Sequence, residues 1–203
     1  MKECLDALLQ ILQTNDLTVV GREHRVSNSI SLMEDKSLDP IVNGFVDMTL
    51  QNREGELFLF DFKWTSSRKY HKELLEKNLS IQLSLYEHLI SLENHGPVVA
   101  TAYFTMPWHK LYTTSSRIAE GANIEHVSPA NDDDLLRKIK NSYRFRRKQL
   151  QQGKIETAEG IEFEEIPYAE AQKNKGFFPL SPDYNNEDIH STNGFSAYTC
   201  FKN

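Results

Sequence analysis

The 203-residue sequence has only two cysteines, Cys4 and Cys200. Two thiols cannot build a disulfide framework, and they are too few for a four-cysteine zinc or iron–sulfur site. No apolar run approaches the roughly 18 residues that a membrane span needs. The first residues also lack the basic flank, apolar stretch and cleavage site of a secretory signal. The sequence therefore predicts a reducing, cytoplasmic setting with no membrane contact and no iron–sulfur cluster.

The sequence also lacks the glycine-rich phosphate loops G-x-x-x-x-G-K-[ST] and G-x-G-x-x-G, and the G-x-S-x-G elbow of hydrolases. We therefore expect no bound nucleotide and no nucleotide-driven motor. Basic residues are in the minority, since 23 Lys and Arg stand against 29 Asp and Glu, for a net charge of −6. Binding of nucleic acid through bulk positive charge is not indicated. The acidity is concentrated in residues 154–203, which hold nine acidic residues and four lysines.

The residue pattern predicts an α/β domain with a central mixed sheet flanked by helices. Helices are expected over residues 2–14, with Leu5, Leu8, Leu9 and Leu12 on one face, over 69–94, and from the N-cap Asn131 to Gln152. Strand patterns cover 17–26, 41–51, 56–64 and 98–105. We predict that residues 1–153 form the core. Residues 154–203 are predicted to be an irregular extension packed on the same domain through Phe177, Phe178 and Phe195.

The loop 52–55 predicts a hairpin in which Gly55 adopts the left-handed conformation. If the loop is the three residues 53–55, position 52 pairs with 56, and Asp47 falls opposite Asp61. Directly opposed residues lie about 5 Å apart. Two half-buried carboxylates at that separation repel each other unless a cation lies between them, and Mg²⁺ prefers such oxygen ligands.

Side chains on a strand alternate between its two faces. In the strand 56–64 the face that must be buried is aromatic: Phe58, Phe60, Phe62 and Trp64. The other face carries Asp61 and Lys63, and Lys63 is placed to hold a water molecule or an anionic transition state. A surface Asp–Lys pair on a solvated strand face is the alternative interpretation of these two residues.

Three motifs follow one another along the chain, Gly44-Phe45-Val46-Asp47, Asp61-Phe62-Lys63 and Gln82-Leu83-Ser84-Leu85-Tyr86. In order and in strand–hairpin–strand–helix setting, residues 17–105 resemble the RecB-like branch of the PD-(D/E)XK nuclease superfamily, whose pattern is G-x-[IV]-D, D-x-K and Q-x-x-x-Y. The resemblance implies a restriction-endonuclease-like core. It also implies a Mg²⁺- or Mn²⁺-dependent DNA nuclease, which we expect to be an exonuclease of DNA repair or recombination.

The resemblance also assigns roles to residues. Asp47, Asp61 and the carbonyl oxygen of Phe62 would bind the metal, and Glu23 on the preceding strand matches a further acidic position beside it. Lys63 would position or activate the attacking water. Gln82 and Tyr86 would orient the site or the DNA from one helix face. For Glu23 the alternative is an ordinary surface residue, and for Gln82 it is a buried amide that bonds a backbone group.

Two departures separate this sequence from the RecB-like pattern. Relatives carry a His on a helix before the first strand, and residues 1–13 contain none. Some relatives also bind an iron–sulfur cluster, for which two cysteines do not suffice. The seven histidines show no metal-ligand spacing and are expected at the surface or in loops: His24, His71, His88, His95, His109, His126 and His190.

Two groups of basic residues are candidates for phosphate contacts. One group follows the strand 56–64 and comprises Arg68, Lys69 and Lys72. The other is the basic stretch 137–148, for which a solvated helix face is the alternative. Relatives are often joined to a helicase or ATPase, so such a partner subunit or domain is expected, and the chain is expected to be part of a longer protein.

Two other functions fit parts of the sequence. A nuclease fold that has lost catalysis could serve a repair complex as a DNA-binding or scaffolding module, and the missing upstream His favours that function. An unrelated α/β binding domain with chance matches to the motifs is the other alternative, and it would place Asp47 and Asp61 on non-adjacent strands.

Overall fold

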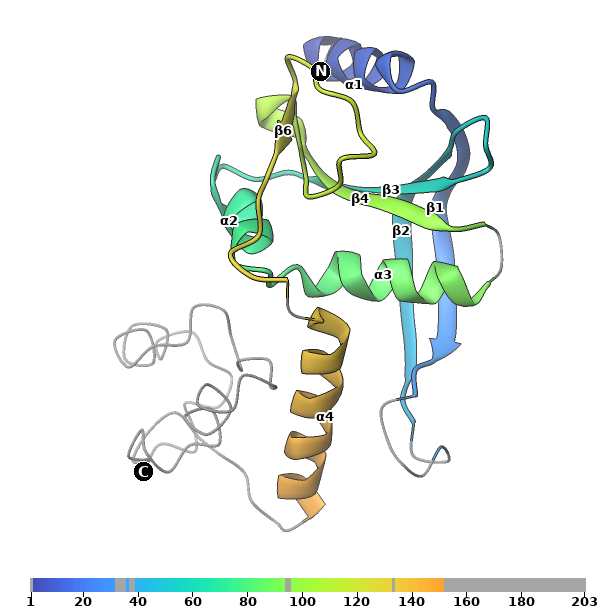
Figure 1. Ribbon diagram of the computed structural model, residues 1–203, viewed down its shortest axis with the longest axis vertical. Helices are drawn as coiled ribbons and strands as arrows, with labels where there is room; N and C mark the ends of the chain where they lie inside the picture. The colour runs from blue at the N-terminus through green and yellow to red at the C-terminus, as the bar shows by residue number, and fades with distance from the viewer. Residues whose placement is uncertain (1, 32–35, 37–38, 94–95, 133, 152–203) are drawn as a thin grey trace. The chain divides into compact units, whose positions relative to one another are not determined.

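The computed structural model describes residues 2–31, 36, 39–93, 96–132 and 134–151 (Figure 1). The chain divides into two compact units, of which the first comprises Met1–Ser31 and Ser37–Asp133. The second contains helix α4 (Leu135–Gln151). Residues 154–203, with Phe177, Phe178 and Phe195, lie outside the described residues, so the core and extension boundaries stay predictions.

The first unit is built on a six-stranded sheet in the order β1-β2-β3-β4-β5-β6. The strands are β1 (Thr18–Ser29), β2 (Ile41–Gln51), β3 (Leu57–Lys63), β4 (Val98–Thr105), β5 (Lys110–Thr113) and β6 (Ile124–His126). The β3/β4 and β5/β6 pairs are parallel, and the other three pairs are antiparallel. This confirms the mixed sheet and its first four strands. The short strands β5 and β6 were not predicted, because three or four residues carry too little periodicity.

Helix α1 (Lys2–Thr14) has the predicted length, but only Leu8 and Leu12 of the predicted face pack against the core. The buried residues are Cys4, Ala7 and Ile11, whereas Leu5 and Leu9 are exposed. Both sets recur at helical spacing, so periodicity alone could not choose between them. The side chains of Cys4 and Ile11 join a core cluster with the aromatic residues of β3 and β4.

The long helix predicted over residues 69–94 is wrong, because the structure has two helices there, α2 (Tyr70–Glu76) and α3 (Ile81–Leu92). Asn78 has a φ of +52°. Its N–H donates to the Leu75 carbonyl at 3.0 Å, and the N–H of Leu79 donates to the Leu74 carbonyl at 2.8 Å. These two bonds form the Schellman motif that ends a helix, with Asn in the left-handed position that Gly more often takes.

The two faces of the sheet bury different residues, and Figure 1 shows α1 and α3 on opposite sides of it. Phe58 and Phe60 of β3 pack in the cluster on the α1 side. A second cluster contains Leu83 of α3 and Tyr103 of β4. The prediction that Trp64 is buried with the aromatic face is wrong, since β3 ends at Lys63 and Trp64 is 77% exposed.

The β2–β3 hairpin has the predicted register. Met48 pairs with Phe60 and Gln51 with Leu57, and the N–H of Asn52 donates to the Glu56 carbonyl at 3.1 Å. Gly55 has a φ of +81°, the left-handed conformation that the turn requires.

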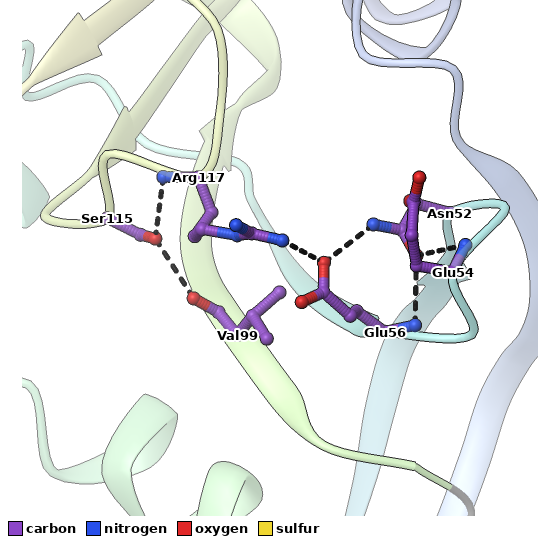
Figure 2. A network of polar contacts seen from close by, with 6 residues as sticks. All are labelled: Asn52, Glu54, Glu56, Val99, Ser115 and Arg117. Carbon is purple, nitrogen blue, oxygen red and sulfur yellow. Dashed lines mark hydrogen bonds and ion pairs between the residues drawn. The ribbon is translucent and has the colours of Figure 1, made fainter.

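A polar network ties this hairpin to the segment after β5 (Figure 2). Asn52 Nδ2 donates to Glu56 Oε2 at 2.7 Å, and the guanidinium of Arg117 forms an ion pair with the same carboxylate. Arg117 and Asn52 together hold the pKa of Glu56 below its usual value. The N–H of Arg117 donates to Ser115 Oγ at 3.2 Å, and that hydroxyl donates to the Val99 carbonyl at 2.9 Å. The network therefore fixes the outer end of the hairpin to β4.

Helix α4 begins at Leu135, so the prediction of Asn131 as its N-cap is wrong. Asp134 Oδ1 accepts a 2.9 Å hydrogen bond from the N–H of Arg137, which is the bond that an N-cap side chain makes. The side chain of Asn131 instead accepts a 3.1 Å bond from Asn78 Nδ2. None of the helices within the described part of the chain is both long enough and apolar enough to cross a membrane.

Candidate functional site

Asp47 and Asp61 lie on the adjacent antiparallel strands β2 and β3. Met48 and Phe60 are the pair next to them, so the same register carried one residue further sets Asp47 opposite Asp61. Asp47 Oδ2 accepts a 2.7 Å hydrogen bond from the backbone N–H of Phe62, which holds its carboxylate against β3. Non-adjacent strands would have confirmed the unrelated α/β domain, and the pairing of β2 with β3 gives that alternative no support.

The carboxylate of Asp61 is almost completely buried, since the residue is 1% exposed. Its Oδ2 lies 2.6 Å from Lys63 Nζ. Burial raises the pKa of Asp61, the ammonium of Lys63 opposes that shift, and the negative charge of Asp47 adds to it. The site therefore holds two mutually repelling carboxylates with a single lysine ammonium bound to the deeper one.

Lys63 is connected to helix α3 by a chain of hydrogen bonds. Its Nζ donates to Gln82 Oε1 at 2.8 Å, and Gln82 Nε2 donates to the hydroxyl of Tyr86 at 2.9 Å. Gln82 and Tyr86 stand one helical turn apart, so both reach the same side of α3. The Gln82 amide thus bonds a site side chain, and the alternative of an amide that bonds a backbone group finds no support in these contacts.

The ring of Tyr86 packs on Gly44, the first residue of the Gly44-to-Asp47 motif. A Cβ atom at position 44 would lie 2.9 Å from Tyr86 Cε1, closer than side chains approach. The glycine therefore makes room for the tyrosine, and the tyrosine hydroxyl bonds Gln82. This packing joins the first and third motifs physically and explains why a residue without a side chain stands at position 44.

Two residues of the site were missed by the sequence analysis. Tyr103 of β4 pairs with Asp61 in the parallel β3/β4 register, and Lys63 Nζ lies 5.7 Å from the centre of its ring. Ser80 Oγ donates to the Tyr103 hydroxyl at 2.8 Å, and burial raises the pKa of Tyr103 to about 12. A tyrosine in a buried strand gives no local signal, because its neighbour Asp61 stands 42 positions earlier in the sequence.

The second missed residue is His71, which is 8% exposed, so the expectation of a surface or loop histidine is wrong for it. Its ring lies 4.9 Å from that of Tyr103. Burial, assisted by the positive charge of Lys63, lowers the pKa of His71 to about 4. Its spacing of four from the buried Leu75 on α2 was the available signal for an inward-facing residue.

Glu23 lies on β1 between Arg22, which pairs with Met48, and His24, which pairs with Val46. It therefore stands across from Asp47. Its φ of +46° departs from the extended backbone on both sides of it. An open pocket of about 680 Å³ lies here, lined by Arg22, Glu23, Asp47, Met48 and Phe62. The structure thus brings Glu23 to the same pocket as Asp47, at its exposed side.

The three predicted basic residues after β3 have different surroundings. Arg68 Cζ lies 4.1 Å from the centre of the Trp108 ring, and Lys69 is exposed. Lys72 Nζ lies 2.7 Å from Glu125 Oε1 and 3.6 Å from Glu76 Oε1. The hydrogen bond with Glu125 raises the pKa of Lys72. Two carboxylates therefore already neutralise Lys72, whereas Arg68 and Lys69 are exposed to solvent.

The residues present fit a divalent cation by their chemistry. Asp47 and Asp61 offer carboxylate oxygens from facing positions, and their repulsion contributes to the raised pKa of Asp61. A cation between them would remove that repulsion, and oxygen ligands are what Mg²⁺ and Mn²⁺ take. In the described part of the chain no three His, Cys, Asp or Glu side chains gather as a ligand group, so Glu23 does not complete such a group with the two aspartates.

The comparison with protein families agrees with this geometry. The sequence model of the PD-(D/E)XK nuclease superfamily matches residues 4–171, which is most of the chain. No curated protein matches the chain.

Proposed function

The chain belongs to the PD-(D/E)XK nuclease superfamily, and we propose that it is a divalent-metal-dependent nuclease that hydrolyses phosphodiester bonds in DNA. The observation that supports this function is the convergence of Asp47, Asp61 and Lys63. They come from two adjacent strands, and helix α3 supplies the hydrogen-bonded partner of Lys63, Gln82. We further propose exonuclease action of the RecB-like kind in repair or recombination, and a helicase or ATPase partner stays a prediction.

The two aspartates and the carbonyl oxygen of Phe62 would hold Mg²⁺ or Mn²⁺. Glu23 lines the same pocket as Asp47 and would add a carboxylate there, outside this ligand group. When bound, such an ion polarises a phosphate oxygen and lowers the pKa of a coordinated water. Lys63 donates to Gln82 and pairs with Asp61, so its ammonium is held at a fixed position. A fixed positive charge beside the scissile phosphate stabilises the negative charge that develops in the transition state.

The test is cleavage of linear DNA by the purified chain with Mn²⁺ or Mg²⁺. We expect degradation that EDTA abolishes and that the variants Asp61→Asn and Lys63→Ala lose by at least about 100-fold. Glu54→Gln is the matched control, because Glu54 is an exposed acidic residue of the hairpin loop outside the site. Metal-dependent cleavage that survives both site variants would overturn the assignment.

A catalytically inactive DNA-binding or scaffolding module is the second candidate function. It is favoured by one observation, that no third acidic or histidine side chain joins Asp47 and Asp61 among the described residues. Calorimetric titration with Mn²⁺ separates the two candidates. Heat of binding that disappears in Asp47→Asn supports the nuclease, and absence of binding together with absence of cleavage supports the inactive module.

A further inference from the structure

Three large aromatic side chains are exposed among the residues whose exposure the structure describes, and each stands close in sequence to a residue of the candidate site. Phe45 is 57% exposed and stands two residues before Asp47. Trp64 is 77% exposed and directly follows Lys63, and Tyr70 is 44% exposed at the start of α2. A single exposed aromatic residue needs no explanation. Two of them, Trp64 and Tyr70, stand at the two ends of one short segment that follows the Asp61-to-Lys63 motif, which makes that segment a candidate binding surface.

Tyr70 is linked to the site through aromatic rings. Its ring lies 5.0 Å from that of His71, in an edge-to-face arrangement. The His71 ring lies 4.9 Å from that of Tyr103, and the Tyr103 ring centre lies 5.7 Å from Lys63 Nζ. Contacts of these lengths position aromatic rings. Tyr70 is therefore held at the outer end of a row of side chains whose inner end is Lys63.

The segment 64–70 combines these aromatic residues with hydroxyl and basic groups, in the order Trp-Thr-Ser-Ser-Arg-Lys-Tyr. Thr65 Oγ1 accepts a 3.1 Å bond from the N–H of Ser67. Ser67 Oγ in turn accepts bonds from the N–H groups of Lys69 at 3.4 Å and Tyr70 at 3.1 Å. The segment thus fixes much of its own backbone, so little ordering would remain to be done on binding.

Arg68 anchors the middle of the segment to the sheet. Its guanidinium stacks over the Trp108 ring at 4.1 Å, and the hydroxyl of Tyr112 donates to its carbonyl oxygen at 3.1 Å. An arginine stacked in this way keeps its charge and its donors available. Arg68 and the exposed Lys69 therefore place two positive charges between Trp64 and Tyr70.

We propose that the segment 64–70 binds single-stranded DNA next to the site, with unpaired bases stacked on Trp64 and Tyr70 and phosphates beside Arg68 and Lys69. Aromatic side chains interleaved with positive charge are the means by which proteins bind single strands. A duplex hides the faces of its bases, so the same surface discriminates against double-stranded DNA. The inference rests on the proposed nuclease function and names the form of DNA that the site takes.

Fluorescence of the full chain in EDTA tests the proposal without cleavage. The chain has two tryptophans, so Trp108→Phe leaves Trp64 as the only one, with an aromatic ring kept under Arg68. A 12-nucleotide single-stranded oligothymidine should quench this fluorescence, and a blunt duplex of the same length should not. Trp64→Ala removes the tryptophan signal, so the affinity of the variants is measured by the anisotropy of a labelled oligothymidine. By that measurement Trp64→Ala and Tyr70→Ala should each weaken single-strand affinity about tenfold. Leu92→Ala, at an exposed apolar residue near the end of α3, should leave it unchanged.

Two results would overturn the proposal: equal affinity for single strand and duplex, or single-strand affinity that Trp64→Ala and Tyr70→Ala both leave intact. Trp64 is mostly exposed, so its replacement leaves the fold in place, which a thermal melt of the variant verifies. Failure of the nuclease assignment is recognised separately. Asp61→Asn should remove cleavage and leave the fluorescence quenching unaffected. Quenching by single strands without any cleavage by the wild-type chain would reject the nuclease function and leave the single-strand binding in place.

Discussion

Lys63 Nζ lies 2.6 Å from Asp61 Oδ2, and the two residues stand on the same strand with Phe62 between them. The period of two along a strand puts both side chains on one face. The side chain of Asp61 is 2% exposed and that of Lys63 is 25% exposed. The carboxylate is therefore shielded from water, whereas the ammonium keeps contact with solvent. In such a pair, removal of one partner leaves the other as an uncompensated buried charge.

Lys63→Met should therefore destabilise the protein at pH 7 by roughly 2 kcal/mol, less than for a fully buried pair because Lys63 is partly exposed. Burial already holds the pKa of Asp61 above its usual value. As pH falls through that raised pKa, Asp61 becomes neutral in the folded state and the penalty disappears. Thermal melts from pH 8 to pH 4.5 should show the variant approaching the wild type. The double variant Lys63→Met/Asp61→Asn is the control, and an equal deficit at every pH in Lys63→Met would contradict this account.

Gln82→Leu should lower the rate of DNA cleavage about tenfold, because Lys63 loses the acceptor that fixes its Nζ. Tyr86→Phe keeps the ring on Gly44 but removes the hydroxyl that bonds Gln82, so a smaller loss is expected. The two residues act through one chain of bonds, and the double variant should therefore be no slower than Gln82→Leu alone. Single-turnover rates measure the three variants, and fully additive losses would refute a shared chain.

Gly44→Ala should destabilise the protein by about 1–2 kcal/mol, because the new methyl group would press on the Tyr86 ring. Combining it with Tyr86→Ala removes the obstacle, so the double variant should be more stable than the sum of the single effects predicts. Chemical denaturation gives the free energies. Gly121→Ala serves as the control, since its Cβ would meet only the flexible end of Ile124, at 3.3 Å. Additive effects of the two substitutions would argue against the packing of Gly44 on Tyr86.

His71→Phe should flatten the loss of stability at acid pH. The pKa of His71 is about 4 in the folded protein against 6.5 for an unperturbed histidine. Between these two values the unfolded chain binds a proton that the folded chain does not, so stability falls as pH decreases from 6.5 to 4. Phenylalanine keeps the ring between Tyr70 and Tyr103 and has no proton to bind. Melting temperatures at pH 7.5 and pH 5 measure the difference, and parallel wild-type and variant profiles would show that His71 does not titrate in this way.

Local chemistry made the hairpin predictable. The loop 53–55 and the alternation of the flanking strands fixed the register, because a hairpin pairs residues that are close in sequence. The pairing of Met48 with Phe60 and the left-handed Gly55 confirm it. The spacing of four between Gln82 and Tyr86 was equally local, and both residues are hydrogen-bonded on one side of α3.

Other features depended on competition between local signals. The break at Asn78 was hidden by a continuous helical pattern, since Asn is tolerated within helices as well as at their ends. The buried face of α1 was decided by which side met the core, where Cys4 and Ile11 pack instead of Leu5 and Leu9. The same periodicity was compatible with one helix or two over residues 69–94, and with either of two buried faces on α1.

The sequence by itself predicted the acidic hairpin, because its turn residues favour a three-residue loop and the period of two then sets Asp47 opposite Asp61. Tertiary structure alone decided the surroundings of that hairpin. Parallel pairing of β3 with β4 set Tyr103 beside Asp61, and the packing of α2 brought His71 onto Tyr103. These contacts join residues far apart in the chain, whose approach depends on burial of the whole sheet and is encoded in no local pattern.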